Sequence, residues 1–326
     1  MRAIVNTGAN ILEMLELPMP QPGPGQVRIH TVAVGICATD LLMVAGWERT
    51  TFPAIPGHEW SGTVDAIGNG VDTSLIGKRC VAENVLSNGM EVGFEHPCGY
   101  AEYFLTEAAN VHIMSSDISF STLALIEPLA VSVRALDRLG TCADGPILLF
   151  GDGPIGLILT LLLSRKGHEV VIVGGRQYRL DIAKEFEAKQ TLNYHDLNGN
   201  LVTSIREMTG LDFPTVIEAS GSGPAMDASM ELVAREGKVL LVGDYGGACA
   251  TIPWNLVLWS EINLIGSNAS AGAWTQAVSL AQEGLPLDKL ITHHLGVSDF
   301  DKGFEIMHNR TSGAIKVVLD WRISNG

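Results

Sequence analysis

The stretch that decides the fold runs from residue 147 to residue 163, and its centre reads Phe150-Gly151-Asp152-Gly153-Pro154-Ile155-Gly156. An apolar run, residues 147–150, precedes this centre, and a second apolar segment, residues 157–163, follows it. That order predicts a buried strand, a glycine-rich turn and a helix. The glycines have the G-x-G-x-x-G spacing of a dinucleotide-binding turn, so the sequence indicates a nucleotide site here.

Each glycine of this turn has a role that a larger residue would not fill. Gly151 would permit the tight turn, Gly153 would let the backbone approach a pyrophosphate, and Gly156 would let helix and strand pack closely. The N-terminus of the helix offers N–H groups and a positive dipole end to phosphate. We expect Pro154 and Ile155, at that helix start, to bind the cofactor together with the glycines. A glycine-rich turn alone is a weak signal, and the flanking strand and helix are what favour a binding site.

Length and charge limit the functions that the chain can have. Its 326 residues, 46% of them hydrophobic, are enough for two domains with separate cores. The formal net charge is −15 at pH 7. This acidity argues against binding to nucleic acid or to an anionic membrane surface, because both need a basic patch. A solvated acidic surface that favours solubility is the simpler interpretation.

The cysteines indicate a reducing compartment. They are odd in number, and no two of them form a C-x-x-C pair: Cys37, Cys80, Cys98, Cys142 and Cys249. This is neither a disulfide framework nor a structural zinc motif. The first residues lack the apolar core of a signal peptide, and the apolar run after residue 156 is too short to span a bilayer. We therefore expect a cytoplasmic protein.

The pattern along the chain divides it into three parts. Residues 1–122 have short alternating segments, turn clusters and repeated glycines, which predict a β-rich domain. In residues 123–266, strands alternate with helices, which predicts a parallel, doubly wound sheet. Residues 267–326 contain a predicted helix and end near a strand at 315–319, and we expect them to return to the first domain. The predicted fold class is therefore α/β.

Three segments in the first 130 residues contain side chains that bind zinc. Residues 35–40 offer a thiol, residues 56–62 an imidazole and a carboxylate, and residues 126–130 a carboxylate. A catalytic zinc takes about three protein ligands and leaves one position open. Each segment also has an ordinary structural interpretation: a lone cysteine is commonly a small buried hydrophobe, and Glu127 could be a helix-start acid. The combination with a dinucleotide turn favours a metal site.

These motifs resemble those of the zinc-dependent medium-chain dehydrogenase/reductase family, which contains the alcohol and polyol dehydrogenases. Residues 35–40, Gly-Ile-Cys-Ala-Thr-Asp, are similar to its G-I-C-G-[ST]-D segment, and residues 57–62, Gly-His-Glu-Trp-Ser-Gly, to its G-H-E-x-x-G segment. Residues 127–131, Glu-Pro-Leu-Ala-Val, are similar to the E-P-L-A-V segment of its sorbitol and threonine dehydrogenase branch. The resemblance covers the whole chain and implies a GroES-like catalytic domain with a Rossmann domain.

The resemblance implies one catalytic zinc ion. Cys37 and His58 would be its ligands, and Glu59 and Glu127 would supply carboxylate oxygens, one or both directly. Such an ion acts as a Lewis acid on the oxygen of an alcohol or ketone substrate, and the nicotinamide exchanges the hydride. We therefore expect the substrate to react at the metal site.

The same resemblance assigns roles in the chemistry to residues beside the metal ligands. Thr39 stands where the family has its proton-relay hydroxyl, and Asp40 would accept a hydrogen bond that orients a ligand. Glu59 would serve both the metal and the chemistry. The usual glycine of the first motif is replaced by Ala38, a change that we expect to alter only loop geometry.

One segment departs clearly from the family. Most zinc members carry a lobe with four closely spaced cysteines that bind a structural zinc, whereas residues 82–98 of this chain are short and contain a single cysteine, Cys98. We therefore expect no structural zinc. Glu83, Glu95 and His96 in this segment are expected to belong to a loop that leads into a strand at residues 100–104.

The end of the second predicted strand bears on the choice of nicotinamide cofactor. NAD sites place an acidic residue there to bind the ribose hydroxyls. In this chain the strand ends at Gly174, and Arg176 and Arg179 follow it. An arginine can hold the 2′-phosphate of NADP by a charge-assisted contact, so we expect NADP rather than NAD, with NAD as the alternative. Arg179 could instead face solvent at the start of the next helix.

The main hypothesis is therefore a zinc-dependent, NADP-linked oxidoreductase of secondary alcohols: a polyol, sugar, cyclitol or hydroxy amino acid. One alternative is a zinc-free reductase of the quinone-reductase type, which shares the fold and would not need Cys37, His58 and Glu127 together. A second alternative is a non-catalytic nucleotide-binding protein of the same fold. We expect a small polar substrate, no nucleic-acid or membrane partner, and a homo-oligomer, dimer or tetramer.

Overall fold

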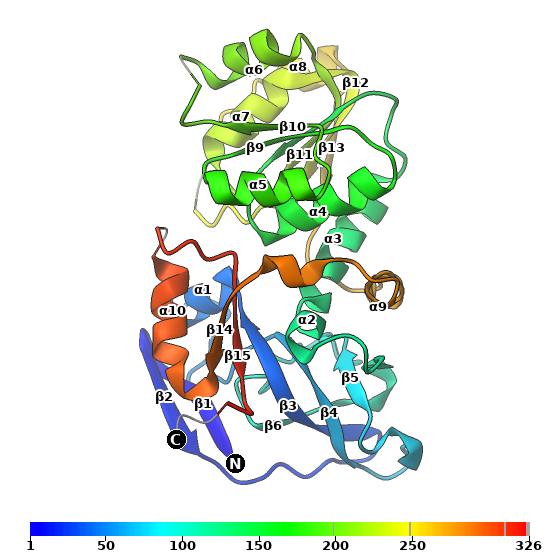
Figure 1. The fold of residues 1–326 in the computed structure, drawn as a ribbon, viewed down its shortest axis with the longest axis vertical. Coiled ribbons are helices and arrows are strands. Elements are labelled where there is room, and N and C mark those ends of the chain that lie inside the picture. Colours follow the sequence, from blue (N-terminus) through cyan, green and yellow to red (C-terminus); the bar gives the residue numbers. More distant parts are fainter. Residues whose placement is uncertain (198, 248, 310, 324–326) are drawn as a thin grey trace. The chain divides into compact units, whose positions relative to one another are not determined.

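The computed structural model describes residues 1–197, 199–247, 249–309 and 311–323. The chain divides into two compact units (Figure 1). The first unit contains Met1–Ala130 and Ser270–Gly326, and the second contains Val131–Ala269. The C-terminal segment thus shares a unit with the N-terminal segment. Within the described residues, the structure contains no helix of the length and apolarity that a membrane crossing requires.

The first unit is built on a mostly antiparallel sheet with the strand order β14-β15-β3-β4-β5-β7, and β6 pairs with β3 beside this path. The strands are β3 (Gln26–Ile36), β4 (Glu59–Ile67), β5 (Arg79–Ala82), β6 (Tyr103–Glu107), β7 (Val111–Ile113), β14 (Ile291–Gly296) and β15 (Lys316–Asp320). A hairpin of β1 (Arg2–Gly8) and β2 (Ile11–Glu16) packs against the same core. The helices are α1 (Ala38–Ala45), α2 (Phe120–Leu123), α9 (Trp274–Gln282) and α10 (Phe300–His308).

Strand β3 is the centre of this unit. In its first half, every second residue is buried, whereas from Thr31 to Ile36 each residue is buried. This change marks the point at which the strand acquires neighbours on both faces. The strand predicted at residues 315–319 is β15, which runs from Lys316 to Asp320 and pairs with β3. The C-terminal strand therefore lies next to the segment that carries Cys37.

The second unit is a parallel sheet with the strand order β10-β9-β8-β11-β12-β13. Its strands are β8 (Ile147–Phe150), β9 (Val170–Gly174), β10 (Gln190–Asn193), β11 (Phe213–Glu218), β12 (Val233–Leu241) and β13 (Asn263–Gly266). The helices are α4 (Pro154–Arg165), α5 (Gln177–Glu185), α6 (Leu201–Thr209), α7 (Gly223–Leu232) and α8 (Trp254–Trp259). Helix α3 (Ile126–Leu139) begins in the first unit and ends in the second. Numbered within the unit, the order is 3-2-1-4-5-6, that of a Rossmann fold, so the α/β fold class is confirmed.

One predicted strand is displaced. Residues 100–104 were expected to be extended, whereas β6 begins at Tyr103. The backbone N–H of Tyr100 instead donates to the carbonyl of Pro56, and its side chain is fully buried. The segment before β6 is thus a loop that buries a tyrosine near the cysteine-bearing segment, and this placement matters for the site.

Candidate metal and cofactor sites

Two neighbouring strands bring the predicted metal ligands together. Cys37 directly follows β3 and caps the N-terminus of α1, while His58 directly precedes β4. In the antiparallel register, Gly35 of β3 faces Glu59 of β4. Residues that lie far apart in the sequence therefore meet at one end of the same strand pair.

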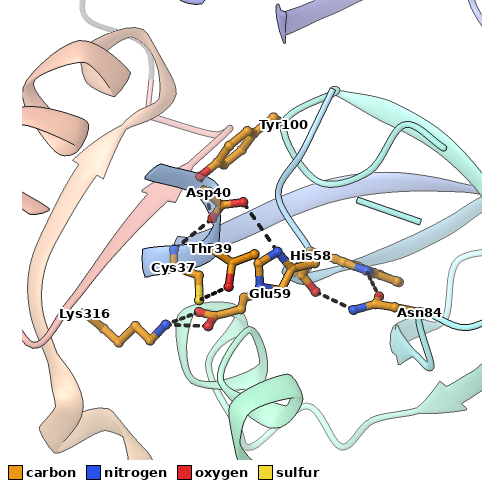
Figure 2. Close-up of polar contacts among 9 residues, drawn as sticks. Cys37, Thr39, Asp40, His58, Glu59, Asn84, Tyr100 and Lys316 are labelled. Atoms are coloured by element: carbon orange, nitrogen blue, oxygen red, sulfur yellow. Dashed lines mark hydrogen bonds and ion pairs between the residues drawn. The ribbon is translucent and has the colours of Figure 1, made fainter. Parts of the chain in front are cut away.

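The three side chains form what we call the donor cluster: Cys37, His58 and Glu59. A sulfur, an imidazole nitrogen and a carboxylate oxygen of these residues all lie within 4.8 Å of one another. A thiolate, an imidazole and a carboxylate are ligands that zinc takes, so the residues present fit the ion that the resemblance implies. Figure 2 shows the cluster with Thr39, whose Oγ1 lies 3.7 Å from Sγ of Cys37.

Asp40 orients the imidazole of His58. Its Oδ1 lies 3.4 Å from Nδ1 of His58, and both side chains are buried. Oδ2 of Asp40 accepts the backbone N–H of Cys37 at 2.8 Å and the hydroxyl of Tyr100 at 3.1 Å. With Nδ1 directed at Asp40, Nε2 is the nitrogen that remains for a metal, which is the arrangement that metal-binding histidines commonly have.

The His58–Asp40 pair shifts both groups towards their charged forms. Burial alone lowers the pKa of His58, but the facing carboxylate of Asp40 outweighs it, and the pKa ends well above its ordinary value. Burial likewise raises the pKa of Asp40, while His58 and the bonds from Cys37 and Tyr100 bring it below its ordinary value. The pair thus favours a charged imidazole that faces a charged carboxylate.

The backbone and ring of His58 are also held by residues of the segment 82–98. Nδ2 of Asn84 donates to the His58 carbonyl at 2.9 Å, and its Oδ1 accepts from the Trp60 indole at 3.4 Å. The ring of Phe94 packs 5.2 Å from the imidazole. Asn84 and Phe94 both belong to the short segment that replaces the family's structural-zinc lobe. Arg49 bonds Glu95 of this segment at 2.8 Å.

Lys316 is the main site residue that sequence reasoning missed. It is 2% exposed, and its Nζ bonds both carboxylate oxygens of Glu59, at 2.5 Å for Oε2 (Figure 2). Burial lowers the pKa of Lys316, but Glu59 reverses this and the pKa ends above its ordinary value. A signal existed, because a lysine inside the apolar run 315–319 requires a buried anionic partner.

Glu127 lies outside the donor cluster. It stands in the first turn of α3, and the burial of its carboxyl raises its pKa to about 7. This value already includes the lowering of the pKa by His58 and Lys316 and its raising by Glu59. The structure thus places Glu127 within electrostatic reach of the cluster, while the three ligand atoms that it brings together come from Cys37, His58 and Glu59.

The glycine turn of the second unit has the predicted geometry. Gly153 caps α4, and Pro154 and Ile155 form its first turn. Gly151 has φ of +115°, and a Cβ on Gly156 would lie 2.0 Å from the carbonyl oxygen of Gly151. A side chain at either position would break the close approach of turn and helix.

An acid from the glycine turn, Asp152, lies against the end of β9. The carboxylate of Asp152 accepts the backbone N–H groups of Gly175 and Arg176 at 2.9 and 2.8 Å. It also lies 3.1 Å from the guanidinium of Arg176 and 3.8 Å from that of Arg179. Both predicted arginines therefore lie near Gly174, at the C-terminal end of β9, and both face the carboxylate of Asp152.

Comparisons with known proteins agree with this arrangement. The family models "Alcohol dehydrogenase GroES-like domain" and "Zinc-binding dehydrogenase" match residues 23–116 and 154–283. An L-threonine 3-dehydrogenase of Deinococcus deserti is 30% identical over 94% of this chain and 95% of the relative. One from Rhizobium etli (strain CIAT 652) is 29% identical over 98% and 99%.

Solved structures share the fold at lower identity. An alcohol dehydrogenase from Escherichia coli CFT073, complexed with NADH, has a TM-score of 0.91 and 22% identity over 98% of this chain and 99% of that chain. A zinc-binding dehydrogenase from Sinorhizobium meliloti 1021, bound to NADP, has a TM-score of 0.90 and 23% identity over 98% of both chains. With the sequence relatives, these findings show that the chain belongs to the zinc-dependent medium-chain dehydrogenase/reductase family, as an NAD(P)-dependent alcohol dehydrogenase.

Proposed function

We propose that this enzyme oxidises a secondary alcohol with further polar groups, and reduces the corresponding ketone, with one catalytic zinc and NADP. The observation that carries the zinc assignment is the donor cluster, whose three ligand atoms lie within 4.8 Å of one another. Asp40 and Lys316 support it, because each is a buried charge placed against one member of the cluster.

The residues of the cluster would hold the ion and position it. A zinc ion bound there supplies Lewis acidity towards the substrate oxygen. Cys37 and His58 bind it, and Asp40 keeps the imidazole in the orientation that directs Nε2 inward. The Thr39 hydroxyl, next to Sγ of Cys37, is placed to carry a proton away from the site. The nicotinamide supplies the hydride chemistry.

The preference for NADP rests on the end of β9. The strand ends at Gly174, so it lacks the acid with which NAD enzymes bind the ribose hydroxyls. The guanidinium groups of Arg176 and Arg179 lie beside this position. Arginine binds phosphate through charge-assisted hydrogen bonds, so a cofactor with a 2′-phosphate is favoured.

The names of the relatives support the proposed substrate class. Those at 29–30% identity are named L-threonine 3-dehydrogenases, enzymes of a hydroxy amino acid. One solved structure of the same fold is titled galactitol-1-phosphate dehydrogenase. We infer that the substrate is a small polar secondary alcohol of the polyol, sugar, cyclitol or hydroxy amino acid classes.

The test is the metal content of the purified protein, for wild type, Cys37→Ala and Cys249→Ala. Cys249 is exposed and lies in the other unit, so its variant controls for loss of a thiol. About one zinc per chain in wild type and control, lost in Cys37→Ala, supports the proposal. No zinc after reconstitution would favour a zinc-free reductase, and about two would mean that the segment 82–98 also binds an ion. Turnover of a panel of secondary alcohols with NADP and with NAD then tests the proposed substrate class and the preference for NADP.

We also propose that the enzyme is a homo-oligomer that associates through the edge of the second sheet. Strand β13 is at the end of the strand order and pairs with β12. Helix α8, just before it, exposes Trp254, Leu258 and Trp259 by 69–70%. An open strand edge beside an apolar patch suits pairing with a second copy across a two-fold axis. Light scattering should show a dimer or tetramer that Trp259→Glu converts towards monomer; a monomeric wild type would refute this.

A further inference from the structure

The side chain of Asp152 joins two neighbouring strand ends. Asp152 follows β8 in the glycine turn, and its Oδ2 accepts both backbone N–H groups that follow Gly174 in the chain, those of Gly175 and Arg176. Its Oδ1 faces the guanidinium of Arg176 at 3.1 Å and that of Arg179 at 3.8 Å. The carboxylate thus holds the backbone after β9 and faces two cationic side chains, those of Arg176 at the start of α5 and Arg179 within it. Arg179 also donates to the backbone carbonyl of Asp152 at 3.4 Å and to the hydroxyl of Tyr178 at 3.0 Å.

Asp152 also excludes a side chain at the end of β9. A Cβ built on Gly174 would lie 2.6 Å from Cβ of Asp152 and 2.7 Å from its Oδ2. Real Cβ atoms do not approach this closely, so an acid at position 174 is incompatible with Asp152. Asp152 in the glycine turn therefore requires glycine at position 174, and it thereby excludes the acid that NAD enzymes carry there.

The carboxylate of Asp152 is poorly suited to replace that missing acid. A carboxylate has about four acceptor sites, and Asp152 uses three of them on the backbone N–H groups of Gly175 and Arg176 and on the guanidinium of Arg176, while the guanidinium of Arg179 lies 3.8 Å away. Its side chain is 6% exposed, against 31% for Arg176 and 12% for Arg179. The solvent-facing part of the three residues Asp152, Arg176 and Arg179 is therefore cationic, because the two guanidinium groups are more exposed than the carboxylate.

We propose that Asp152 is a positioning residue for cofactor specificity: it tethers Arg176 and Arg179 in the place that receives the 2′-phosphate of NADP. This inference rests on the proposed preference for NADP and adds how that preference is built. Arginine side chains lose considerable conformational entropy when they bind an anion, and tethering them in advance reduces this loss. The negative charge of Asp152 lowers the net positive charge at this position, but it keeps the guanidinium groups of Arg176 and Arg179 in place.

The experiment measures calorimetric binding of two cofactor fragments that differ by one group: adenosine 2′,5′-bisphosphate and 5′-AMP. The quantity compared is the ratio of their Kd values in the full-length protein. Asp152→Asn keeps a side-chain oxygen for the backbone N–H groups but removes the charge that holds the arginines. Asp181→Asn, an exposed aspartate on α5 that pairs with Lys184, is the matched control.

Wild type should bind the bisphosphate more tightly, and Asp152→Asn should reduce that preference by about tenfold, the value of one charge-assisted hydrogen bond. Binding of 5′-AMP should stay within about threefold, which also shows that the variant is folded; Asp181→Asn should leave the ratio unchanged. If wild type shows no preference for the bisphosphate, the NADP proposal fails, and this inference fails with it. If wild type shows the preference and Asp152→Asn keeps or increases it, only the positioning role is overturned.

A second variant moves the acid instead of removing it. Because the contact at Gly174 involves Cβ of Asp152, only glycine at position 152 clears the space. Asp152→Gly combined with Gly174→Asp should therefore reverse the preference towards the fragment without a 2′-phosphate. An unchanged preference for the bisphosphate in this double variant would contradict the coupling of the two positions.

Discussion

Replacing Lys316 by methionine should strongly destabilise the first unit. Methionine has a similar length and no charge, so the substitution removes the ammonium while keeping most of the volume. Lys316 and Glu59 are almost fully buried, with side-chain exposures of 3% and 1%. The variant therefore leaves a buried carboxylate without its cation, and this carboxylate lies within electrostatic reach of Glu127.

The magnitude follows from the geometry. At the 2.5 Å that separates Nζ from Oε2 of Glu59, and with an effective dielectric constant near 20, the attraction of the pair is about 7 kcal/mol. Much of this offsets the desolvation of the two charges. Removing one partner of a buried pair costs about 3–5 kcal/mol, a large part of the roughly 5–15 kcal/mol that stabilises a typical folded protein.

The assay is denaturant unfolding of the wild type, Lys316→Met, Glu59→Gln and the double variant, each with and without zinc. We expect both single variants to lose about 3 kcal/mol or more without zinc, and the double variant to recover most of the loss because it buries no unpaired charge. Bound zinc should reduce the loss in Lys316→Met, since the ion places positive charge next to Glu59. A loss below about 1 kcal/mol, or additive losses in the double variant, would refute the reasoning.

Three further predictions concern single side chains. Chelation should expose Cys37 to iodoacetamide, detected by mass spectrometry, while the buried Cys80, whose pKa burial raises to about 12, stays unmodified in both states; equal labelling of Cys37 with and without zinc would contradict its role as a ligand. Gly174→Ala should cost about 1–3 kcal/mol in denaturant unfolding through its contact with Asp152, and the same substitution should cost clearly less when it is made in Asp152→Gly, where that contact is absent. Thr39→Ala should lower turnover about a hundredfold or more with unchanged zinc content, and wild-type turnover would exclude the relay.

The fold was predictable because its signals are local. The glycine turn, the alternation of strands and helices, and the apolar runs each depend on a few consecutive residues, and strands that alternate with helices of this length pair in parallel. The boundaries were less predictable. Strand β6 begins at Tyr103 rather than at residue 100 because Tyr100 turns inward to bond Asp40, a contact between segments sixty residues apart.

The site was predictable only where a motif carried it. Cys37, His58 and Glu59 stand in recognisable segments, and the structure brings their ligand atoms together. Lys316 stands outside such segments, and its importance comes from a partner that the fold supplies. Asp152 stands inside the glycine motif, but the motif assigns a role only to its glycines, whereas the carboxylate of Asp152 reaches the neighbouring strand end. Long-range charge pairs of this kind cannot be read from spacing.

The charges of the first unit explain why a lysine belongs beside a metal site. In the metal-free state with His58 protonated, the buried pairs His58–Asp40 and Lys316–Glu59 each carry balanced charges. In the zinc-bound state of the proposed site, ligands bind in their deprotonated forms, so a Cys37 thiolate and a neutral His58 would offset the two positive charges of the ion. Without Lys316, both states would bury one uncompensated negative charge, which is the costly arrangement in a low-dielectric interior.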